Sequence, residues 1–319
     1  MEPDLSRCSH SRDAYGEALV EVGERNPAVV VLDSDLSAST KTSRFARRFP
    51  GRFFDLGIAE QNLIDVAAGL ALSGKIPFVS TFAIFGCGRA WEQIRNTVAL
   101  DSLTVNLVMT HAGLSLGGDG ATHQSLEDLA LMRVIPNMRV MVPADSTETR
   151  EMVRFAAREP GPKYIRLSRR RTLDVFTEGE YRYDAASYPV LADGTDVTLC
   201  TCGCMVRESL LARRLLGEKG ISARVIDVHT VKPLAREAVL REARRTGCIV
   251  SVEEHSVHGG LGSALAELLA EEYPVPLKRI GVQDQFGGSG RVDELYAHFG
   301  LDAASIARTV QDLVEKRRR

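Results

Sequence analysis

Short hydrophobic runs alternate with amphipathic segments along most of this chain. In the first half the runs are rich in Val, Ile and Phe, and each ends in polar residues, which is typical of buried strands in a parallel sheet. The predicted strands are 28–35, 53–58, 76–82, 103–113, 138–145 and 163–169. The segments between them, such as 11–25 and 146–159, are predicted to be helices. This alternation predicts an α/β fold with helices on both faces of a mostly parallel sheet.

The segment from Leu173 to Thr195 interrupts this pattern, because it is polar, irregular and dotted with aromatic residues. We interpret 176–194 as a linker between two domains, at 1–175 and 195–319. Beyond it the alternation resumes, so the second domain is expected to be a smaller α/β unit of the same kind. Its predicted strands are 196–203, 222–231, 248–256 and 276–284, with helices at 205–220, 233–247 and 262–273.

Acidic and basic residues nearly cancel, since 40 Lys and Arg against 42 Asp and Glu give a formal net charge of −2 at pH 7. So small a charge does not favour binding to nucleic acid or to an anionic membrane. The sequence has no apolar segment long enough to span a membrane and no apolar signal core near its start, so a cytoplasmic protein is expected. Its six cysteines are expected to be free thiols, which fits that compartment.

Polar and charged residues collect where the predicted strands of the first domain end. Ligands of open parallel sheets bind outside the carboxyl ends of the strands, so these side chains are expected to meet at a binding edge. A purely structural domain has little reason to gather carboxylates, hydroxyls, an imidazole and a guanidinium there. They are Asp33, Asp35, Glu60, Ser80, Thr81, Thr110, His111, Asp145, Ser168 and Arg169.

Glu60 stands between an extended apolar run and an apolar helix, in RFFDLGIAEQNLIDVAAGL (52–70). The helix dipole favours a carboxylate in the first helical turn by roughly 0.3–1 kcal/mol, which is one sufficient explanation. Phe82 and Phe85 follow the next predicted strand three residues apart, so they can share one helix face. Core packing is the usual reason for such a pair. Both features therefore keep a structural alternative at this point.

The segment Thr110–Gln124 contains four glycines and a histidine near each end. Glycine-rich backbone can approach a ligand closely, and Asp119 and His123 could each hydrogen-bond a polyol. The alternative is a long surface loop. It is not a phosphate-binding P-loop, because no Gly-Lys-Ser or Gly-Lys-Thr follows the glycines.

Two other motifs have ordinary interpretations. The cysteines of CTCGC (200–204) lack the C-x-x-C spacing of zinc sites, so a strand-to-helix turn is expected and no metal ligand is predicted in this chain. The segment EEHSVHGGLG (253–262) lacks the full glycine spacing of a dinucleotide-binding turn. A tight turn is its usual interpretation, although the N-terminus of the next helix could hold an anion.

Taken together, the motifs resemble the C-terminal part of transketolase, and they occur in that family's order. They are GIAEQN (57–62), STFAIF (80–85) with RAWEQIR (89–95), GLSLGGDGATHQSLEDLALMRVIPNMRVMVPAD (113–145), YIRLSRR (164–170) and EEHSVHGGLGSA (253–264). The resemblance covers essentially the whole chain and implies the pyrimidine-binding and C-terminal domains of the family. The family's metal- and diphosphate-binding motif is expected on a separate N-terminal subunit.

The resemblance implies that thiamine diphosphate is the cofactor, with Mg²⁺ or Ca²⁺ held mainly by the partner subunit. Glu60 would hydrogen-bond a ring nitrogen of the aminopyrimidine and activate the cofactor, and Phe82 and Phe85 would pack on that ring. The apolar neighbours Phe54 and Ile58, with this aromatic pair, are expected to enclose Glu60 and raise its pKa. Gly88 stands where many members carry another aromatic residue.

The resemblance also implies a substrate site. Asp119 and His123 would contact sugar hydroxyls near the reacting carbon, so with Glu60 they are the predicted catalytic residues. The positions that match the family's phosphate-binding residues are Arg12, Ser39, His111 and Arg169.

We therefore interpret the chain as the C-terminal subunit of a split transketolase-like enzyme in an α2β2 assembly. It would move a two-carbon ketol unit from a ketose phosphate to an aldose acceptor through a thiamine diphosphate adduct. Alternatives are a subunit similar to 1-deoxyxylulose-5-phosphate synthase or to the β subunit of 2-oxo acid dehydrogenase, a transketolase with an unusual acceptor, and a non-catalytic scaffold or regulatory subunit. THAG (110–113) and RLSRR (166–170) favour transketolase. A scaffold would need none of Glu60, Asp119, His123 and Arg169.

Overall fold

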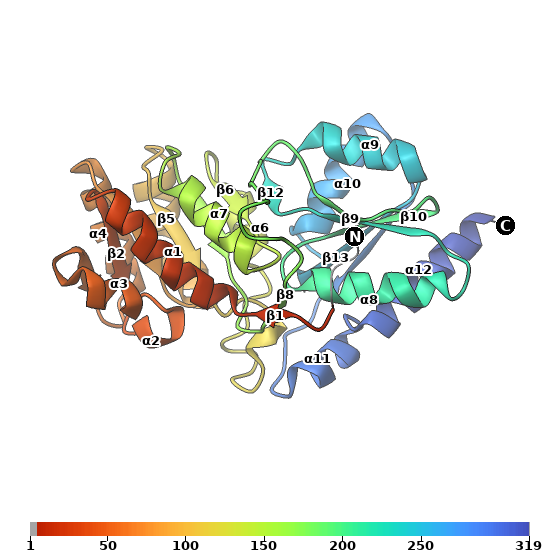
Figure 1. Ribbon diagram of the computed structural model, residues 1–319, viewed down its shortest axis with the longest axis horizontal. Coiled ribbons are helices and arrows are strands. Elements are labelled where there is room, and N and C mark those ends of the chain that lie inside the picture. The colour runs from red at the N-terminus through yellow and green to blue at the C-terminus, as the bar shows by residue number, and fades with distance from the viewer. Residues whose placement is uncertain (1–4, 319) are drawn as a thin grey trace.

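A seven-stranded sheet forms the centre of the N-terminal domain in the computed structural model, which describes residues 5–318 (Figure 1). The strand order is β12-β6-β7-β5-β4-β2-β3, and all neighbours are parallel except β12, which runs antiparallel to β6. The strands are β2 (Val29–Asp33), β3 (Phe53–Asp55), β4 (Ile76–Ser80), β5 (Asn106–Met109), β6 (Arg139–Met141), β7 (Lys163–Arg166) and β12 (Thr230–Lys232). The strands predicted for this domain are thus confirmed, each as a shorter strand within its predicted range.

Neighbouring residues of these strands face two different helix layers. Val29 and Val31 pack in the cluster formed with α1, α3 and α7, whereas Val30 and Leu32 pack in the cluster formed with α4 and α6. Burial on both faces is the reason why the strands read as continuous apolar runs. The α-helices are α1 (Ser11–Arg25), α2 (Ser37–Thr40), α3 (Ser43–Arg48), α4 (Glu60–Leu72), α5 (Trp91–Gln93), α6 (Asp128–Arg133) and α7 (Ser146–Ala156); the 3₁₀ and π segments are η1 (Pro50–Arg52), η2 (Ile84–Arg89), η3 (Ile94–Ala99) and η4 (Leu114–Leu116).

The C-terminal domain has a five-stranded sheet in the order β14-β13-β10-β11-β9, parallel except for β9. Figure 1 shows α9 and α10 on one side of this sheet and α8 and α12 on the other. This confirms the second α/β unit expected from the sequence. Its elements are β9 (Val190–Ala192), β10 (Val197–Thr201), α8 (Met205–Gly217), β11 (Ala223–Asp227), α9 (Arg236–Thr246), β13 (Ile249–Ser256), α10 (Leu261–Glu272), β14 (Leu277–Val282), α11 (Val292–Phe299) and α12 (Ala303–Arg318).

Several short strands pair with strands that lie far from them in the sequence. Strand β12 belongs to the C-terminal half of the chain, yet it extends the N-terminal sheet. The last part of the proposed linker forms β9, which pairs with β11. A further short pair joins β1 (Cys8–Ser9) to β8 (Thr172–Leu173). Such short strands carry little periodicity, so only their distant partners define them.

Arg166, at the end of β7, links the two domains. Its side chain is 5% exposed, and it forms a two-pronged ion pair with Asp128, with Nε 2.7 Å from Oδ2 and a terminal nitrogen 3.2 Å from Oδ1. The same guanidinium donates to the carbonyl oxygen of Glu254 in β13 at 2.9 Å. Burial alone would raise the pKa of Asp128, but the charge of Arg166 holds it below its ordinary value. One buried charge pair thus joins β7, α6 and the C-terminal domain.

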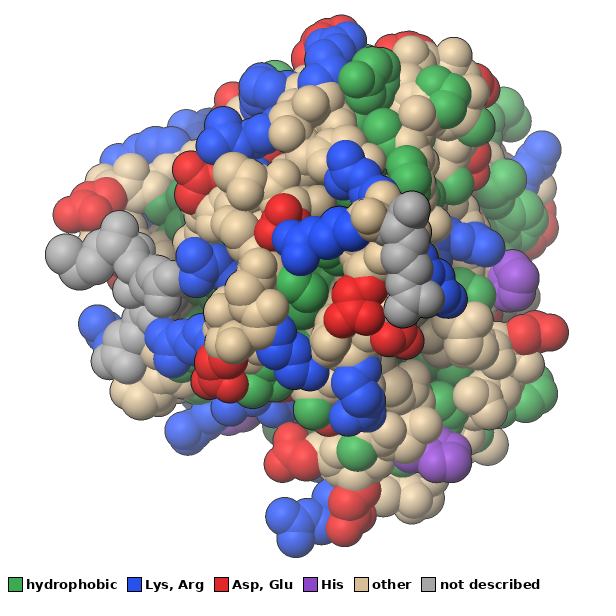
Figure 2. Space-filling view, turned by 90° about the vertical axis from the view of Figure 1, so that its right-hand side faces the viewer, with side chains coloured by type: hydrophobic (Ala, Val, Ile, Leu, Met, Phe, Trp, Pro, Cys, Tyr) green, Lys and Arg blue, Asp and Glu red, His purple; other side chains and the backbone are tan. Residues whose placement is uncertain are grey.

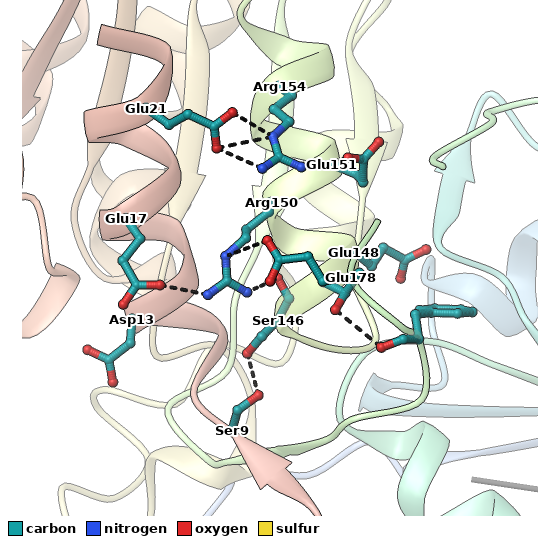
Figure 3. A network of polar contacts seen from close by, with 12 residues as sticks. Ser9, Asp13, Glu17, Glu21, Ser146, Glu148, Arg150, Glu151, Arg154 and Glu178 are labelled. Carbon is teal, nitrogen blue, oxygen red and sulfur yellow. Dashed lines mark hydrogen bonds and ion pairs between the residues drawn. The ribbon is translucent and has the colours of Figure 1, made fainter. Parts of the chain in front are cut away.

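An ionic network fixes α1 against α7 (Figure 3). Arg150 lies 2.6 Å from Glu17, and Arg154 holds Glu21 with Nε at 3.0 Å and a terminal nitrogen at 2.7 Å. Such partly exposed pairs contribute little individually, but a network of them specifies the position of the helix. That position matters because the first turn of α1 carries Arg12.

Charged side chains of both signs are interspersed over the end of the molecule shown in Figure 2, which agrees with the formal net charge of −2. Within residues 5–318, no helix is long and apolar enough to cross a membrane.

A cluster of buried acids lies where α7, the linker and the end of β11 meet. Asp145 accepts from the backbone amides of Val175 and Phe176 and thereby holds the linker. Glu148 accepts from Tyr181, and it lies near enough to Asp227 for its charge to raise the pKa of that carboxyl. The two carboxyl oxygens of Asp227 are buried and have no hydrogen-bond partner among the described residues. Two facing carboxyls satisfy each other when one of them carries a proton.

Burial raises the pKa of Glu148 to about 7 and that of Asp227 well above its ordinary value. The folded protein therefore binds more protons here than the unfolded chain, and stability falls as the pH rises from about 4.5 through about 7. We expect Asp227→Asn, whose amide can donate to Glu148 without titrating, to remove the part of this fall that comes from Asp227, while Glu148 stays buried and keeps its own part. At pH 9 the variant should be more stable than wild type by roughly 2–3 kcal/mol, a gain that shrinks toward pH 5.

Urea unfolding of both proteins between pH 5 and pH 9 measures the difference. Parallel pH profiles for the two proteins would contradict a shared proton at this position.

Candidate active site

The predicted site residues lie in one continuous set of contacts at the carboxyl edge of the N-terminal sheet. They come from α1, the loop after β2, the start of α4, the segment after β4, the loop after β5 and the segment after β7. The set has a cationic end around Arg12, a carboxylate at Glu60 and an aromatic pair between them. Their functional roles remain predictions.

The cationic end is built around Arg12. Its guanidinium donates to the carbonyl oxygen of Ser39 at 2.7 Å and that of Arg169 at 3.3 Å, and it lies 3.4 Å from Nε2 of His111. Its Nε atom is buried and has no hydrogen-bond partner among the described residues. The partners of this arginine are therefore neutral acceptors, and one of its donors is left for a ligand.

Lys41 is a further cation at this end that sequence reasoning missed. It follows the single turn of α2 in the left-handed conformation, with φ of 74°. Asp33 fixes the loop before it, because this buried carboxylate accepts from the hydroxyls of Thr40 and Thr42 at 2.7 Å each. No local pattern could have indicated Lys41, since only the fold of this loop brings it to the site.

His111 connects the cations with the aromatic pair. It is 4% exposed and adopts φ of 60°, a strained conformation for a residue other than glycine and one that concentrates at functional sites. Burial and then the charges of Arg12, Arg169 and Lys41 lower its pKa to about 3. The ring is therefore neutral near pH 7. Because Arg12 donates toward Nε2, the hydrogen lies on Nδ1, which contacts the Thr110 hydroxyl at 2.7 Å.

Phe82 and Phe85 form the middle of the site. Their rings stack with centroids 5.7 Å apart, and Phe82 also stacks on His111 at 3.8 Å. Phe85 meets His123 edge to face at 5.3 Å. Phe82 is buried and Phe85 is partly exposed, and the pair lies between the two histidines outside the main hydrophobic clusters of the two domains.

The side chain of Glu60 is 4% exposed, and Arg89 is its hydrogen-bond partner, with one nitrogen 3.1 and 3.2 Å from the two carboxyl oxygens. Arg89 is half-exposed and also lies over the ring of Phe85, 4.2 Å from its centroid. Sequence reasoning missed Arg89. The nearest signal was its place one turn after Phe85, in the same run as the aromatic pair.

The expected enclosure of Glu60 needs correction. Phe54 is 38% exposed and Ile58 is 76% exposed, so neither supplies a buried apolar wall. Phe54 is exposed because β3 is an edge strand with a single neighbouring strand, and Ile58 lies in the connection between β3 and α4. Gly88 also leaves space, because a Cβ atom there would meet only Ile84, at 3.9 Å.

The glycine-rich loop lies beside Arg169. Its guanidinium donates to the carbonyl oxygen of Leu116 at 2.6 Å and lies 3.7 Å from the carboxylate of Asp119. Asp119 and Arg169 are each about half exposed, so both can reach a ligand. The alternative of a surface loop holds only for the tip, because residues 110–117 are buried and exposure begins at Gly118. A contact of the loop with a ligand stays a prediction.

The two motifs with ordinary interpretations are structural. Cys202 to Cys204 form the turn from β10 to α8, and the thiol of Cys204 donates to Glu254 at 3.0 Å. The N-terminus of α10 is filled by the chain's own carboxylate, because Glu253 accepts from the amides of Leu261 and Gly262 at 2.7 and 2.8 Å. Within the described part of the chain, no group of three or more His, Cys, Asp or Glu residues could hold a metal ion.

Comparison with known proteins shows which family has domains like those of this chain. The model of the transketolase pyrimidine-binding domain matches residues 9–173, and that of the transketolase C-terminal domain matches residues 187–306. A protein of Methanocaldococcus jannaschii named as a transketolase C-terminal section is 46% identical over 307 residues, covering 96% of each chain. A 6-deoxy-6-sulfo-D-fructose transketolase subunit of Clostridium sp. strain MSTE9 is 44% identical, over 96% of this chain and 95% of that protein. A solved structure titled split gene transketolase, inactive beta4 tetramer, is similar with a TM-score of 0.89 and 51% identity, covering 96% of this chain and 98% of that one.

The lowered pKa of His111 gives a direct test of the cationic end. We expect its ring to stay neutral from pH 5 to pH 8, and we expect Arg12→Gln to raise its pKa because a neighbouring positive charge is removed. Imidazole carbon–proton NMR spectra across this range measure both, with the His111→Gln spectrum identifying the signal. A wild-type midpoint near the ordinary value of 6.5 would contradict the described electrostatics.

Proposed function

This chain belongs to the transketolase family, and on that premise we propose that it is the C-terminal subunit of a split transketolase-like enzyme. The subunit would act with a separate N-terminal subunit that holds the diphosphate and the Mg²⁺ or Ca²⁺ ion. The observation that carries the proposal is the joining of Glu60, the aromatic pair and the Arg12 cluster at one sheet edge. The titles of the relatives support a split arrangement, since they name a section, a subunit and a split gene product.

The residues at this edge fit the pyrimidine half of thiamine diphosphate. Glu60 presents a buried carboxyl, Phe82 and Phe85 present stacked rings, and the space beside Gly88 is open. When bound, thiamine diphosphate supplies a carbon nucleophile and an electron sink for two-carbon transfer. In the proposed complex Glu60 holds a proton toward a ring nitrogen. Both its oxygens share one Arg89 nitrogen, so each keeps capacity for a second partner.

The substrate end fits a sugar phosphate. Arg12, Lys41 and Arg169 place positive charge around the neutral ring of His111, and the unpartnered Nε of Arg12 supplies a donor. A guanidinium recognises phosphate through charge-assisted hydrogen bonds. Asp119 and His123 would hydrogen-bond the hydroxyl groups of the same sugar. In this arrangement the protein binds and orients the sugar and excludes water from the reacting carbons.

We propose an α2β2 assembly for the active enzyme. Ile58 and Phe54, exposed beside the site, are apolar surface that the N-terminal subunit would cover. The beta4 tetramer of the related split gene transketolase is titled inactive, which agrees with a need for the other subunit.

The first test of this proposal is reconstitution. We expect turnover of a ketose phosphate and an aldose phosphate only when the N-terminal subunit, thiamine diphosphate and Mg²⁺ are present with this chain. Glu60→Ala should then lose at least about 100-fold in activity, because proton transfer by a positioned carboxyl contributes roughly 10²–10⁴-fold. If Glu60 served only the helix dipole, stability would fall by about 1 kcal/mol or less and activity would survive.

Asp65→Ala is the matched control, because Asp65 is an exposed carboxylate on the same helix. Steady-state rates and thermal melts of both variants separate the two roles. Turnover by this chain alone would contradict the split arrangement, and a nearly fully active Glu60→Ala would contradict cofactor activation.

The second test concerns phosphate. We expect Arg169→Ala to lose about 10- to 150-fold in kcat/KM for a phosphorylated donor, because a hydrogen bond to a charged group contributes roughly 1.5–3 kcal/mol. The loss for hydroxypyruvate should be smaller by about tenfold. Arg171→Ala is the control, since that exposed arginine of the same run contacts His10 instead. Equal losses on both donors would mean that Arg169 does not read phosphate.

A further inference from the structure

The glycine-rich loop from Gly113 to Gln124 is held by the C-terminal domain at its start, its tip and its end. At the start, the carboxylate of Glu254 accepts from the backbone amide of Ser115, and from its hydroxyl at 3.2 Å. At the tip, the hydroxyl of Ser289 donates to the carbonyl oxygen of Gly118 at 2.6 Å. At the end, the side-chain amide of Gln124 donates to the carbonyl oxygen of Gly288 at 2.9 Å.

At the start of the loop, the contact with Glu254 is closely packed both around Glu254 and around the loop backbone at Gly113. Glu254 is 2% exposed, its carboxylate also accepts from Cys204, and its carbonyl oxygen accepts from Arg166. Gly113 adopts φ of 79°, and a Cβ atom there would lie 2.4 Å from the carboxyl carbon of Glu254. Close approach of loop backbone and carboxylate therefore requires glycine at this position.

The anchor at the end depends on Gln124. This side chain is 3% exposed, and its nitrogen lies within 3.4 Å of the carbonyl oxygens of Leu114 and Gly117 as well as that of Gly288. It thus ties both ends of the turn at η4 to the segment 287–290. A Cβ atom on Gly287 would lie 1.9 Å from Oε1 of Gln124 and 3.1 Å from Leu114. Any side chain there must displace the amide group of Gln124, whose Oε1 has no hydrogen-bond partner among the described residues, and this shift disturbs the hydrogen bonds that its nitrogen donates.

The tip needs these external contacts. Within the loop, the amides of Gly120, His123 and Gln124 bond only to carbonyls of the turn itself, whereas Gly118 and Asp119 are exposed. Contacts from outside the turn come from Ser289 and from Arg169. The position of the loop is therefore determined by the C-terminal domain on one side and by Arg169, the proposed phosphate-binding residue, on the other.

We propose that the segment 287–290 of the C-terminal domain is a clamp that positions the substrate-contacting loop, with Gln124 and Ser289 as positioning residues for Asp119 and His123. The inference rests on the proposed function of the site, because those two residues must contact sugar hydroxyls for their placement to matter. The clamp would determine recognition of the polyhydroxy chain of the donor. Among the hydrogen bonds and ring contacts of the described residues, Glu60, Phe82 and Phe85 do not contact the clamp itself, and the loop meets this aromatic pair only at the edge-to-face contact of His123 with Phe85.

Neighbouring glycines provide a matched pair for the test. Gly287→Ala places a methyl group against Gln124, whereas Gly288→Ala keeps the accepting carbonyl and places its methyl 3.9 Å from Leu295. Neither glycine has a positive φ, so alanine suits both backbones. Ser289→Ala removes the hydroxyl at the tip without crowding anything.

In the complex with the N-terminal subunit, we expect Gly287→Ala to lower kcat/KM for a ketose phosphate by about 10- to 100-fold, since displacing reacting groups by about 1 Å costs about 100-fold. Ser289→Ala should cost a few-fold, and Gly288→Ala should match wild type. The dissociation constant of thiamine diphosphate should stay within about twofold of wild type in all three.

Hydrogen exchange on the chain provides a readout that does not depend on activity. Amides of residues 114–124 should exchange faster in Gly287→Ala and Ser289→Ala than in Gly288→Ala, with the rest of the chain unchanged. Unchanged exchange would overturn the clamp, and faster exchange with wild-type kcat/KM would overturn its positioning role. If the wild-type complex shows no two-carbon transfer, the proposed function fails, while the exchange result still decides whether the clamp exists.

Discussion

Arg166 is buried at the boundary between the two domains, and it cannot leave Asp128 without stranding a charge. Breaking a buried ion pair from one side costs about 3–5 kcal/mol, a large part of the stability of an ordinary domain. The pair fixes the end of β7. Ser168 and Arg169, which follow two and three residues later, therefore enter the site in one orientation. It also holds the backbone of Glu254, whose carboxylate in turn anchors the glycine-rich loop. The geometry of the substrate end thus depends on this one interaction.

Positive and negative side chains lie at opposite ends of the site. The cations gather at Arg12, Lys41 and Arg169, while Glu60 lies beyond the stacked rings of Phe82 and Phe85. His111 can lie between them only because it is neutral, since a charged ring would repel the arginine that contacts it. The proposed function assigns the two ends to two different ligands, with the phosphate of the sugar at the cations and the pyrimidine of the cofactor beside Glu60.

Local patterns predicted what depends on neighbours in sequence. The strand at Val29–Asp33 was found because burial on both faces gives a continuous apolar run, and the helix that begins at Glu60 was found because its apolar residues recur with a helical period. The local pattern joined Thr230 and Val231 to the predicted strand 222–231, whereas in the structure they belong to the separate strand β12, which pairs with β6 of the other domain. Lys41, Arg89 and Ser289 were missed for the same reason, because each reaches the site through tertiary packing. The predicted apolar wall of Phe54 and Ile58 was wrong because Phe54 lies on the edge strand β3 and Ile58 lies in the connection that follows it, where hydrophobicity does not guarantee burial.

Two places in this fold attract negative charge, and their difference separates structure from function. The N-terminus of α10 looks like an anion site in the sequence, but Glu253 occupies it with two backbone hydrogen bonds, so its positive end is already neutralised. Around Arg12 the fold does the opposite. It surrounds the guanidinium with carbonyl oxygens and a neutral imidazole and leaves a buried nitrogen without a partner. An unsatisfied buried donor is costly, and folded proteins retain one where something else completes it. The glycine motif at 253–262, which has the more familiar form in the sequence, is therefore structural. The cluster around Arg12, whose residues come from distant segments, is the one that fits a ligand.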